Sequence, residues 1–99
     1  MNMQALMREA QKMQKELMKT QEELESKTYE GVSSLVNVTI NGKNELVSVK
    51  INSEDDISKD DIELLEDMIL VAVNDAIKKA SMEKEKKLSK YGQGLTGLM

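Results

Sequence analysis

The sequence lacks cysteine and histidine entirely. The chain therefore forms no disulfide, and it lacks the usual ligands of structural zinc, the thiol nucleophile and the side chain best suited to proton transfer near neutral pH. Most enzyme mechanisms depend on at least one of these groups. We therefore predict that the protein is not an enzyme and that it uses neither a metal nor a cofactor.

Aromatic residues are almost absent as well. There is no phenylalanine or tryptophan, and the two tyrosines make up 2% of the 99 residues. The core must therefore consist mainly of aliphatic side chains and methionine. Because a domain of this length buries only about two-thirds of the surface of its unfolded chain, we predict a single domain over residues 1–99 whose thin core gains buried area in a homodimer.

Long hydrophobic runs are also missing. Nowhere are 18 consecutive residues apolar, so no membrane-spanning segment is expected. The N-terminal residues carry no basic side chain ahead of their first apolar positions, which differs from a signal peptide. The sequence therefore predicts a cytoplasmic protein whose partners include neither a membrane nor a small-molecule substrate.

The formal net charge of −4 conceals an uneven distribution. Residues 1–20 carry a net +2 and residues 78–90 a net +4, whereas residues 21–77 hold fourteen acids against four lysines. Both ends of the chain are thus basic and its middle is acidic. The overall charge argues against nucleic acid as a partner, but the charge of the two ends does not.

The first long segment, residues 2–27, consists mainly of good helix formers. Its apolar positions recur in steps of three and four, with one polar interruption at Thr20. They are Met3, Leu6, Ala10, Met13, Leu17 and Leu24. Such a narrow seam is typical of a coiled-coil contact, so we predict a helix over about residues 2–27 that pairs with a second copy of the chain.

The next segment, about residues 28–52, changes to a period of two. Apolar residues alternate with polar ones over residues 36–40 and 47–51, which predicts two half-buried strands around the turn signal Asn41-Gly42. We favour a four-residue loop, Asn41 to Asn44, with Val38 opposite Val47 and Val36 opposite Val49. The alternative two-residue loop sets Val38 against Glu45.

A weaker strand pattern covers residues 28–32, followed by Ser33-Ser34 as a turn. It completes a three-stranded antiparallel sheet. The fold class predicted for the chain is therefore α+β, with one long helix before the strands in the sequence and another after them.

The second helix is predicted over about residues 58–90. Ser58 and Asp61 have the spacing of a capping box. The helix is apolar around much of its girth as far as Ala80, which indicates that it packs against the sheet on one face and against a partner on another, with Ile69 and Val73 as candidate contacts. Beyond Ala80 we expect it to project into solvent, ahead of a mobile tail, residues 91–99.

Two rows of basic side chains follow helical spacing. Arg8, Lys12, Lys15 and Lys19 lie on the face of the first helix opposite the apolar seam, and a second row near the chain end comprises Lys79, Lys84, Lys86, Lys87 and Lys90. Rows of point charges suit the phosphates of a duplex without reading its bases. The alternative is that both rows are ordinary solvated helix surfaces.

Other unusual features have structural explanations. The acids of residues 54–67 do not have the spacing of a calcium-binding loop, and those near Ser58 suit a helix N-terminus. Several of the eight methionines lie on or beside the apolar seam, where packing is their expected use.

Several segments in register resemble the YbaB/EbfC family of bacterial nucleoid-associated proteins. They are residues 6–14 (LMREAQKMQ), 36–42 (VNVTING), 65–69 (LEDMI), 72–76 (AVNDA) and the tail rich in glycine and leucine. The resemblance covers nearly the whole chain. It implies a tweezer-like homodimer with a sheet-based body and protruding helices, which binds duplex DNA with low or modest sequence preference and affects nucleoid organisation or gene expression.

Carried onto this sequence, the resemblance implies DNA contact at the projecting helical ends. The candidate residues are Arg8, Lys12, Lys15, Lys19, Lys84, Lys86, Lys87 and Lys90. The alternative function is an adaptor that binds replication or recombination proteins through its tail or helix grooves, with DNA binding incidental.

Overall fold

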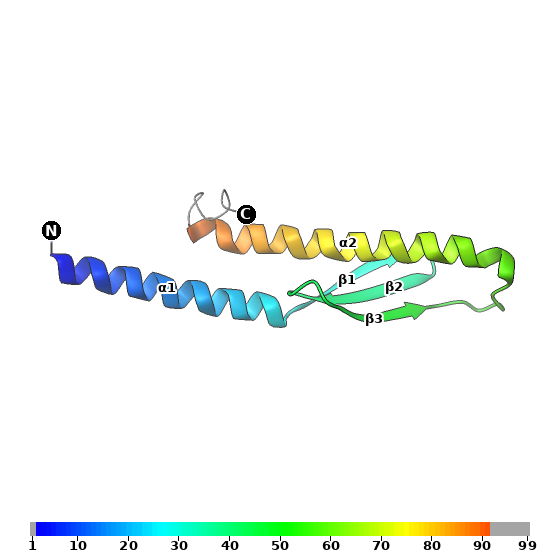
Figure 1. The fold of residues 1–99 in the computed structure, drawn as a ribbon, viewed down its shortest axis with the longest axis horizontal. Coiled ribbons are helices and arrows are strands. Elements are labelled where there is room, and N and C mark those ends of the chain that lie inside the picture. Colours follow the sequence, from blue (N-terminus) through cyan, green and yellow to red (C-terminus); the bar gives the residue numbers. More distant parts are fainter. Residues whose placement is uncertain (1, 92–99) are drawn as a thin grey trace.

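A computed structural model describes residues 2–91 of the chain (Figure 1). Its elements follow in the order α1 (Met3–Ser26), β1 (Thr28–Ser33), β2 (Val36–Asn41), β3 (Leu46–Ile51), a 3-10 turn η1 (Lys59–Asp61), α2 (Ile62–Leu88) and a second 3-10 turn η2 (Ser89–Tyr91). The strands form one antiparallel sheet in the order β1-β2-β3. The predicted α+β class and element order are confirmed.

Local capping fixes the start of both long helices. The Asn2 side chain accepts a hydrogen bond from the backbone N–H of Gln4 at 3.0 Å, which satisfies one free donor at the start of α1. Ahead of α2, the backbone N–H of Ser58 donates to the Asp61 carboxylate at 3.1 Å. The predicted capping box is therefore present, but it begins the 3-10 turn η1, and α2 itself starts only at Ile62.

The core lies between α2 and the first two strands. Val36, Val38 and Ile40 of β2 are 0–1% exposed, and they face the side of α2 that carries Ala72 and Ala76. Gly31 of β1 is also needed here, because a Cβ atom at this position would overlap the backbone of Ala72 and Ala76. Small residues on both elements thus let the helix approach the sheet closely.

Strand β3 departs from the sequence prediction. It was expected to be half-buried, but all six of its residues are exposed. Leu46, Val49 and Ile51 pair with Ile40, Val38 and Val36, so they share the face that α2 covers elsewhere. They are nevertheless 42–50% exposed, because α2 packs over β1 and β2 and does not cover β3.

The register of the second hairpin is also different from the predicted one. Val38 pairs with Val49 and Val36 with Ile51, whereas Val47 and Val49 were expected opposite them. A bulge between Thr39 and Ile40 shifts the pairing. The predicted pairing was therefore wrong by two residues.

Turn chemistry explains why the hairpin loop lies later than expected. Asn41 belongs to β2, and its side-chain oxygen accepts hydrogen bonds from the backbone N–H groups of Lys43 and Glu45 at 2.9 and 3.0 Å. Asn44 adopts the left-handed conformation, with φ 62°. The loop therefore comprises residues 42–45 instead of 41–44.

The first turn shows a smaller difference. Ser33 belongs to β1 and pairs with Val36, so the turn consists of Ser34 and Leu35 instead of Ser33 and Ser34. Ser34 takes the positive φ, 50°, that such a tight turn requires.

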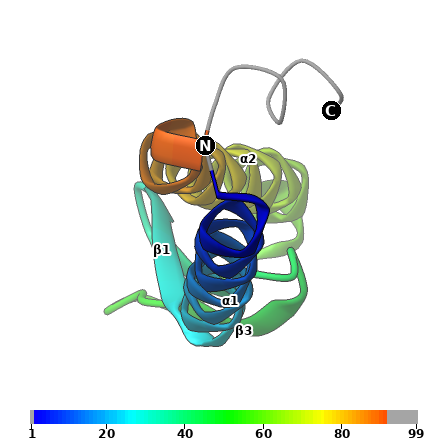
Figure 2. The same cartoon turned by 90° about the vertical axis from the view of Figure 1, so that its left-hand side faces the viewer.

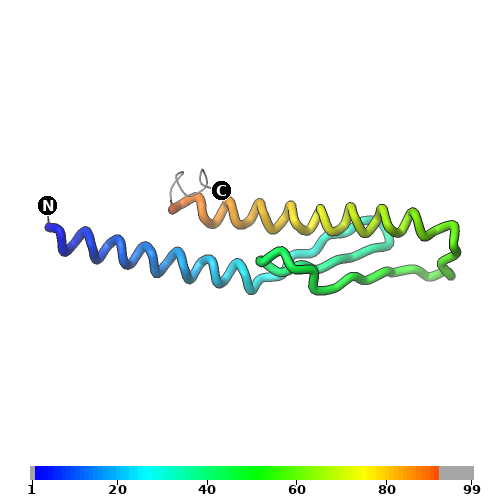
Figure 3. Tube along the Cα trace, viewed as in Figure 1, coloured from blue at the N-terminus to red at the C-terminus, as the bar shows by residue number. Residues whose placement is uncertain are grey.

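The molecule is elongated, with principal extents of 71 × 22 × 14 Å and a radius of gyration of 19.6 Å. A compact domain of this length has a radius of gyration of about 13 Å. The excess arises from α1, whose N-terminal half extends beyond the end of α2 (Figures 1 and 3). We call residues 3–16 of α1 the arm, and the sheet with α2 the body.

Candidate nucleic-acid interface

The arm offers an extended row of cations. Every residue from 2 to 16 is exposed, so neither the apolar seam nor the basic row of the arm packs on the body. Arg8, Lys12 and Lys15 lie on the arm, and Lys19 follows on the same helix face about two turns before Ser26, the last residue of α1. At 1.5 Å per residue the row extends for about 16 Å.

These four cations have no carboxylate partner within residues 2–91. The ion pairs in this part of the chain are Lys27–Glu83 and Lys79–Asp75, and both belong to the body or to the junction between body and arm. The basic row of α1 is therefore available to an external anion.

The basic row of α2 has a more mixed environment. Lys86, Lys87 and Lys90 are exposed and line an open groove of about 550 Å³ between the ends of α1 and α2. Lys84 is half-buried. Lys79 instead stabilises the body, because its ammonium group donates to the backbone carbonyl of Glu30 at 3.0 Å and contacts Asp75 at 3.1 Å.

The sequence predicted that α2 projects into solvent beyond Ala80. In the structure this end of the helix does not project freely. Leu88 is only 6% exposed, and the base of α1 lies beside this part of the helix (Figure 2). The hydroxyl groups of Thr20 and Tyr91 are 3.1 Å apart and share a hydrogen bond. The two basic rows are thus brought to the same end of the molecule.

The junction between arm and body depends on a turn glycine and a seam leucine whose mutual contact the sequence did not predict. The backbone N–H of Gly42 donates to the carbonyl groups of Glu25 and Lys27, and a Cβ atom at position 42 would overlap the backbone of Leu24. Leu24 itself is 4% exposed. The glycine of the hairpin turn therefore holds the base of α1 against the sheet.

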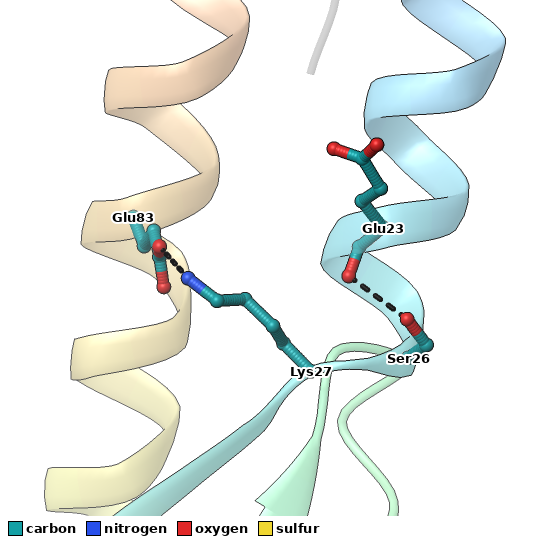
Figure 4. Close-up of polar contacts among 4 residues, drawn as sticks. All are labelled: Glu23, Ser26, Lys27 and Glu83. Carbon is teal, nitrogen blue, oxygen red and sulfur yellow. Dashed lines mark hydrogen bonds and ion pairs between the residues drawn. The ribbon is translucent and has the colours of Figure 1, made fainter.

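An ion pair reinforces this junction. The Lys27 ammonium group, just after α1, contacts the Glu83 carboxylate on α2, and Figure 4 shows the lysine side chain crossing the space between the two elements. The Ser26 hydroxyl donates to the carbonyl of Glu23 at 3.1 Å, which satisfies one free acceptor at the end of α1. Together these contacts fix where the helix leaves the body.

Two pKa shifts accompany the ion pair. The hydrogen bond from Lys27 is the main reason that the pKa of the Glu83 carboxyl is lowered. Burial, and then the neighbouring Glu83, raise the pKa of the Tyr29 phenol. Tyr29 was not predicted as a core residue, but its side chain is only 7% exposed and belongs to the core.

The candidate dimer contacts occupy two different environments. Met3, Leu6 and Met13 of the seam are 44–72% exposed on the arm. Ile69 and Val73, in contrast, are partly buried and pack against the intramolecular core. The tail proposed for the adaptor function was residues 91–99; Tyr91 ends η2, and residues 92–99 lie outside the described residues.

Other kinds of site are not evident in the part of the chain that the structure describes. Within residues 2–91, no three acidic side chains lie close enough together to hold a metal ion. No helix in the same range is both long and apolar enough to cross a membrane.

Comparison with known proteins places this arrangement in context. The model of the YbaB/EbfC DNA-binding family matches residues 1–95. A nucleoid-associated protein of Enterococcus faecalis is 40% identical over 97 residues, covering 97% of this chain and 93% of the relative. Another, from Ruminiclostridium cellulolyticum, is 44% identical over 98 residues, covering 98% and 85% respectively.

The fold has also been seen in a solved structure. An uncharacterized protein from Helicobacter pylori superimposes with a TM-score of 0.71 at 23% identity, covering 93% of this chain and 99% of the other. At that identity the likeness concerns the fold alone.

Proposed function

Because this chain belongs to the YbaB/EbfC DNA-binding family, we propose that it binds duplex DNA as a homodimer, mainly through contacts between the basic row of α1 and the phosphate backbone. The relatives that it matches are named nucleoid-associated proteins. We therefore place its action at the bacterial nucleoid, in the organisation of DNA or the expression of genes.

The observation that carries this proposal is the exposure of the basic row on an arm that contributes little to the core. Arg8, Lys12 and Lys15 are exposed, and the described residues offer them no carboxylate partner. Their release of counterions from the phosphates supplies affinity without sequence recognition. Lys86, Lys87 and Lys90 at the same end of the molecule are proposed to add contacts to the same duplex.

Dimer formation is supported by the apolar surface that the single chain leaves open. Leu46, Val49 and Ile51 form an uncovered strip on the core side of the sheet, and we propose that a second copy covers it. Burial of these three side chains between copies would remove apolar surface from water and stabilise the pair. The seam of the arm is the other candidate contact, and the two are separable by mutation.

Pairing matters for binding because it doubles the number of basic rows. A single row of exposed cations makes only a weak contact with DNA. Two rows held in one particle raise the effective concentration of the second contact once the first has formed. Weak phosphate contacts can thereby give useful affinity without any base recognition.

The experiment on DNA binding compares two triple variants that change the net charge equally. R8E/K12E/K15E reverses charges on the arm, and K43E/K50E/K59E reverses three exposed lysines of the body. With labelled duplexes of unrelated sequence, the arm variant is expected to lose more than about tenfold in affinity. The body variant is expected to lose much less. Equal losses in the two variants would contradict a specific role for the arm.

The experiment on dimer formation uses the solution mass of single-lysine variants. V49K places a charge on the uncovered strip, whereas S48K places the same charge on the opposite face of the same strand. M13K tests the seam of the arm. We expect a dimer for the wild type, S48K and M13K, and a monomer for V49K. A monomeric M13K with a dimeric V49K would move the interface to the arm.

A further inference from the structure

The end of the molecule opposite the arm has its own surface feature. A hollow of about 200 Å³ opens between the chain after β3, the β1–β2 turn and the first turns of α2. Leu35, Ile57 and Met68 contribute to its apolar lining, and Asp55 and Asp56 lie beside them. The hollow has room for a side chain of the size of leucine or methionine.

This hollow is apolar inside and strongly acidic around its opening. Leu35 and Ile57 are 39% and 43% exposed, so the apolar lining is open to an incoming group. Residues 54–67 hold eight acids and a single lysine, Lys59. Neither of the ion pairs found within residues 2–91 involves this segment, so its charge is not neutralised within the described part of the chain.

The tip of the arm has the complementary chemistry. Met3 and Met7 are 72% and 60% exposed and lie one turn apart on the helix. Arg8, which follows Met7 directly, and Lys12 project from other sides of the same helical turns and are also exposed. Methionine side chains adapt to irregular apolar surfaces. The arm tip therefore combines apolar side chains with two cations, and the hollow combines an apolar lining with acids.

The arm cannot reach the hollow of its own chain. The two lie at opposite ends of the molecule in Figure 1, and its longest extent is 71 Å. We propose that the arm tip of one molecule docks into the acidic hollow of another copy, so that the protein assembles end to end. The contact would combine burial of Met3 and Met7 with ion pairs from Arg8 and Lys12.

This contact goes beyond DNA binding but shares residues with it. Because Arg8 and Lys12 belong to the basic row of α1, a duplex and the acidic hollow compete for the same arm. Added duplex is therefore expected to dissociate the end-to-end assemblies. The acidic end of one molecule thus competes with DNA for the arm of another, which favours release of DNA when the protein is concentrated.

The test is sedimentation of the full chain at two salt concentrations, without DNA. At about 0.1 M salt the Debye length is about 10 Å, and at about 1 M it is about 3 Å. We expect the wild type to form species larger than those seen at high salt, in a concentration-dependent manner. Both D55K/D56K and R8E/K12E are expected to lose these species.

Mixing the two variants gives the decisive result. D55K/D56K retains a basic arm and R8E/K12E retains an acidic hollow, so the mixture restores matched ends and is expected to recover the larger species. E22K/E25K, which reverses two exposed acids near the base of α1, is the charge-matched control and should assemble like the wild type. Circular dichroism checks that each variant is folded.

Three outcomes would overturn the proposal. They are a wild type without larger species at low salt, assembly of D55K/D56K equal to that of the wild type, and a mixture that fails to recover although both variants are folded. The result is separable from DNA binding, because D55K/D56K retains the basic row of α1 and is expected to bind duplex DNA at least as tightly as the wild type even where its assembly is lost.

Discussion

The body and the arm are built from similar residue types but use them differently. In the body, three β2 side chains are almost fully buried against the alanine face of α2. In the arm, residues 3–16 follow an equally regular apolar pattern, and all of them are exposed. The difference shows that periodicity predicts a helix but not its partner. The body contains the buried core, whereas the arm leaves all of its side chains exposed.

The largest loss of folding stability is expected from a substitution where α2 packs on β1. Gly31→Val introduces a side chain into backbone atoms of Ala72 and Ala76, which cannot move aside as a flexible side chain can. The free energy of unfolding should fall by about 3 kcal/mol, as measured by thermal or urea denaturation. The matched control is Val32→Ala at the half-exposed neighbour, which should change stability by about 0.5 kcal/mol or less.

The next largest loss of folding stability is expected from replacing a leucine of α1, and it should depend on which end of the helix is changed. Leu24→Ala at the buried base should cost about 2 kcal/mol, whereas Leu6→Ala on the arm should cost about 0.5 kcal/mol or less. Denaturation at several protein concentrations is the measurement. A large cost for Leu6→Ala that grows with protein concentration would show that the seam is buried between copies, and would weaken the distinction between arm and body.

A third substitution tests how the arm is attached. Gly42→Ala should disturb the contact with the Leu24 backbone and change the direction of α1 while the body stays folded. Because the chain has no cysteine, a pair introduced at Ala5 and Lys84 can be spin-labelled without background. We expect a broader distance distribution in the Gly42→Ala protein than in the glycine parent. An unchanged distribution would mean that the turn does not set the direction of the arm.

The smallest change in folding stability is expected from removing the ion pair between Lys27 and Glu83 at the junction. The Lys27 contact lowers the pKa of Glu83 in the folded state. Its stabilisation is therefore present above the ordinary glutamate pKa, about 4.3, and is lost as the pH falls through the lowered value. Because Lys27 is 53% exposed, the contribution is below about 1 kcal/mol. Lys27→Met should flatten the acid side of the stability profile, and an unchanged profile would contradict this role.

The sequence predicted those features that depend on local periodicity. Steps of three and four defined α1 within a residue at each end, and the alternation of Val36, Val38 and Ile40 identified the buried strand. Ser58 and Asp61 indicated where the second helical segment begins. In each case the signal lies within a few residues of the element that it predicts.

Features set by long-range packing were not predictable in this way. The pattern of Val47, Val49 and Ile51 is that of a half-buried strand, but burial depends on whether α2 reaches it. The bulge between Thr39 and Ile40 changed the register, although the turn residues were recognised. The packing roles of Gly31 and Gly42 had no sequence signal, although Gly42 was recognised as a turn residue, because the residues they contact are distant in the chain.

The candidate site was predictable in composition but not in arrangement. The spacing of Arg8, Lys12 and Lys15 identified the basic row, and the structure places it on an arm without intramolecular support. The role of Lys79 in holding Asp75 and Glu30 required the fold to be seen. Sequence alone therefore could not separate lysines that stabilise the body from those that are available to a ligand.

We propose above all that the arm binds phosphates, and this is best tested by measuring how duplex binding depends on salt concentration. The logarithm of the binding constant should fall linearly with the logarithm of salt concentration, with a slope of about −0.9 for each phosphate neutralised. For R8Q/K12Q/K15Q we predict a slope shallower by about 3 for each arm that contacts the duplex, while K43Q/K50Q/K59Q keeps the wild-type slope. A wild-type slope in the arm variant would show that the arm does not bind the phosphates.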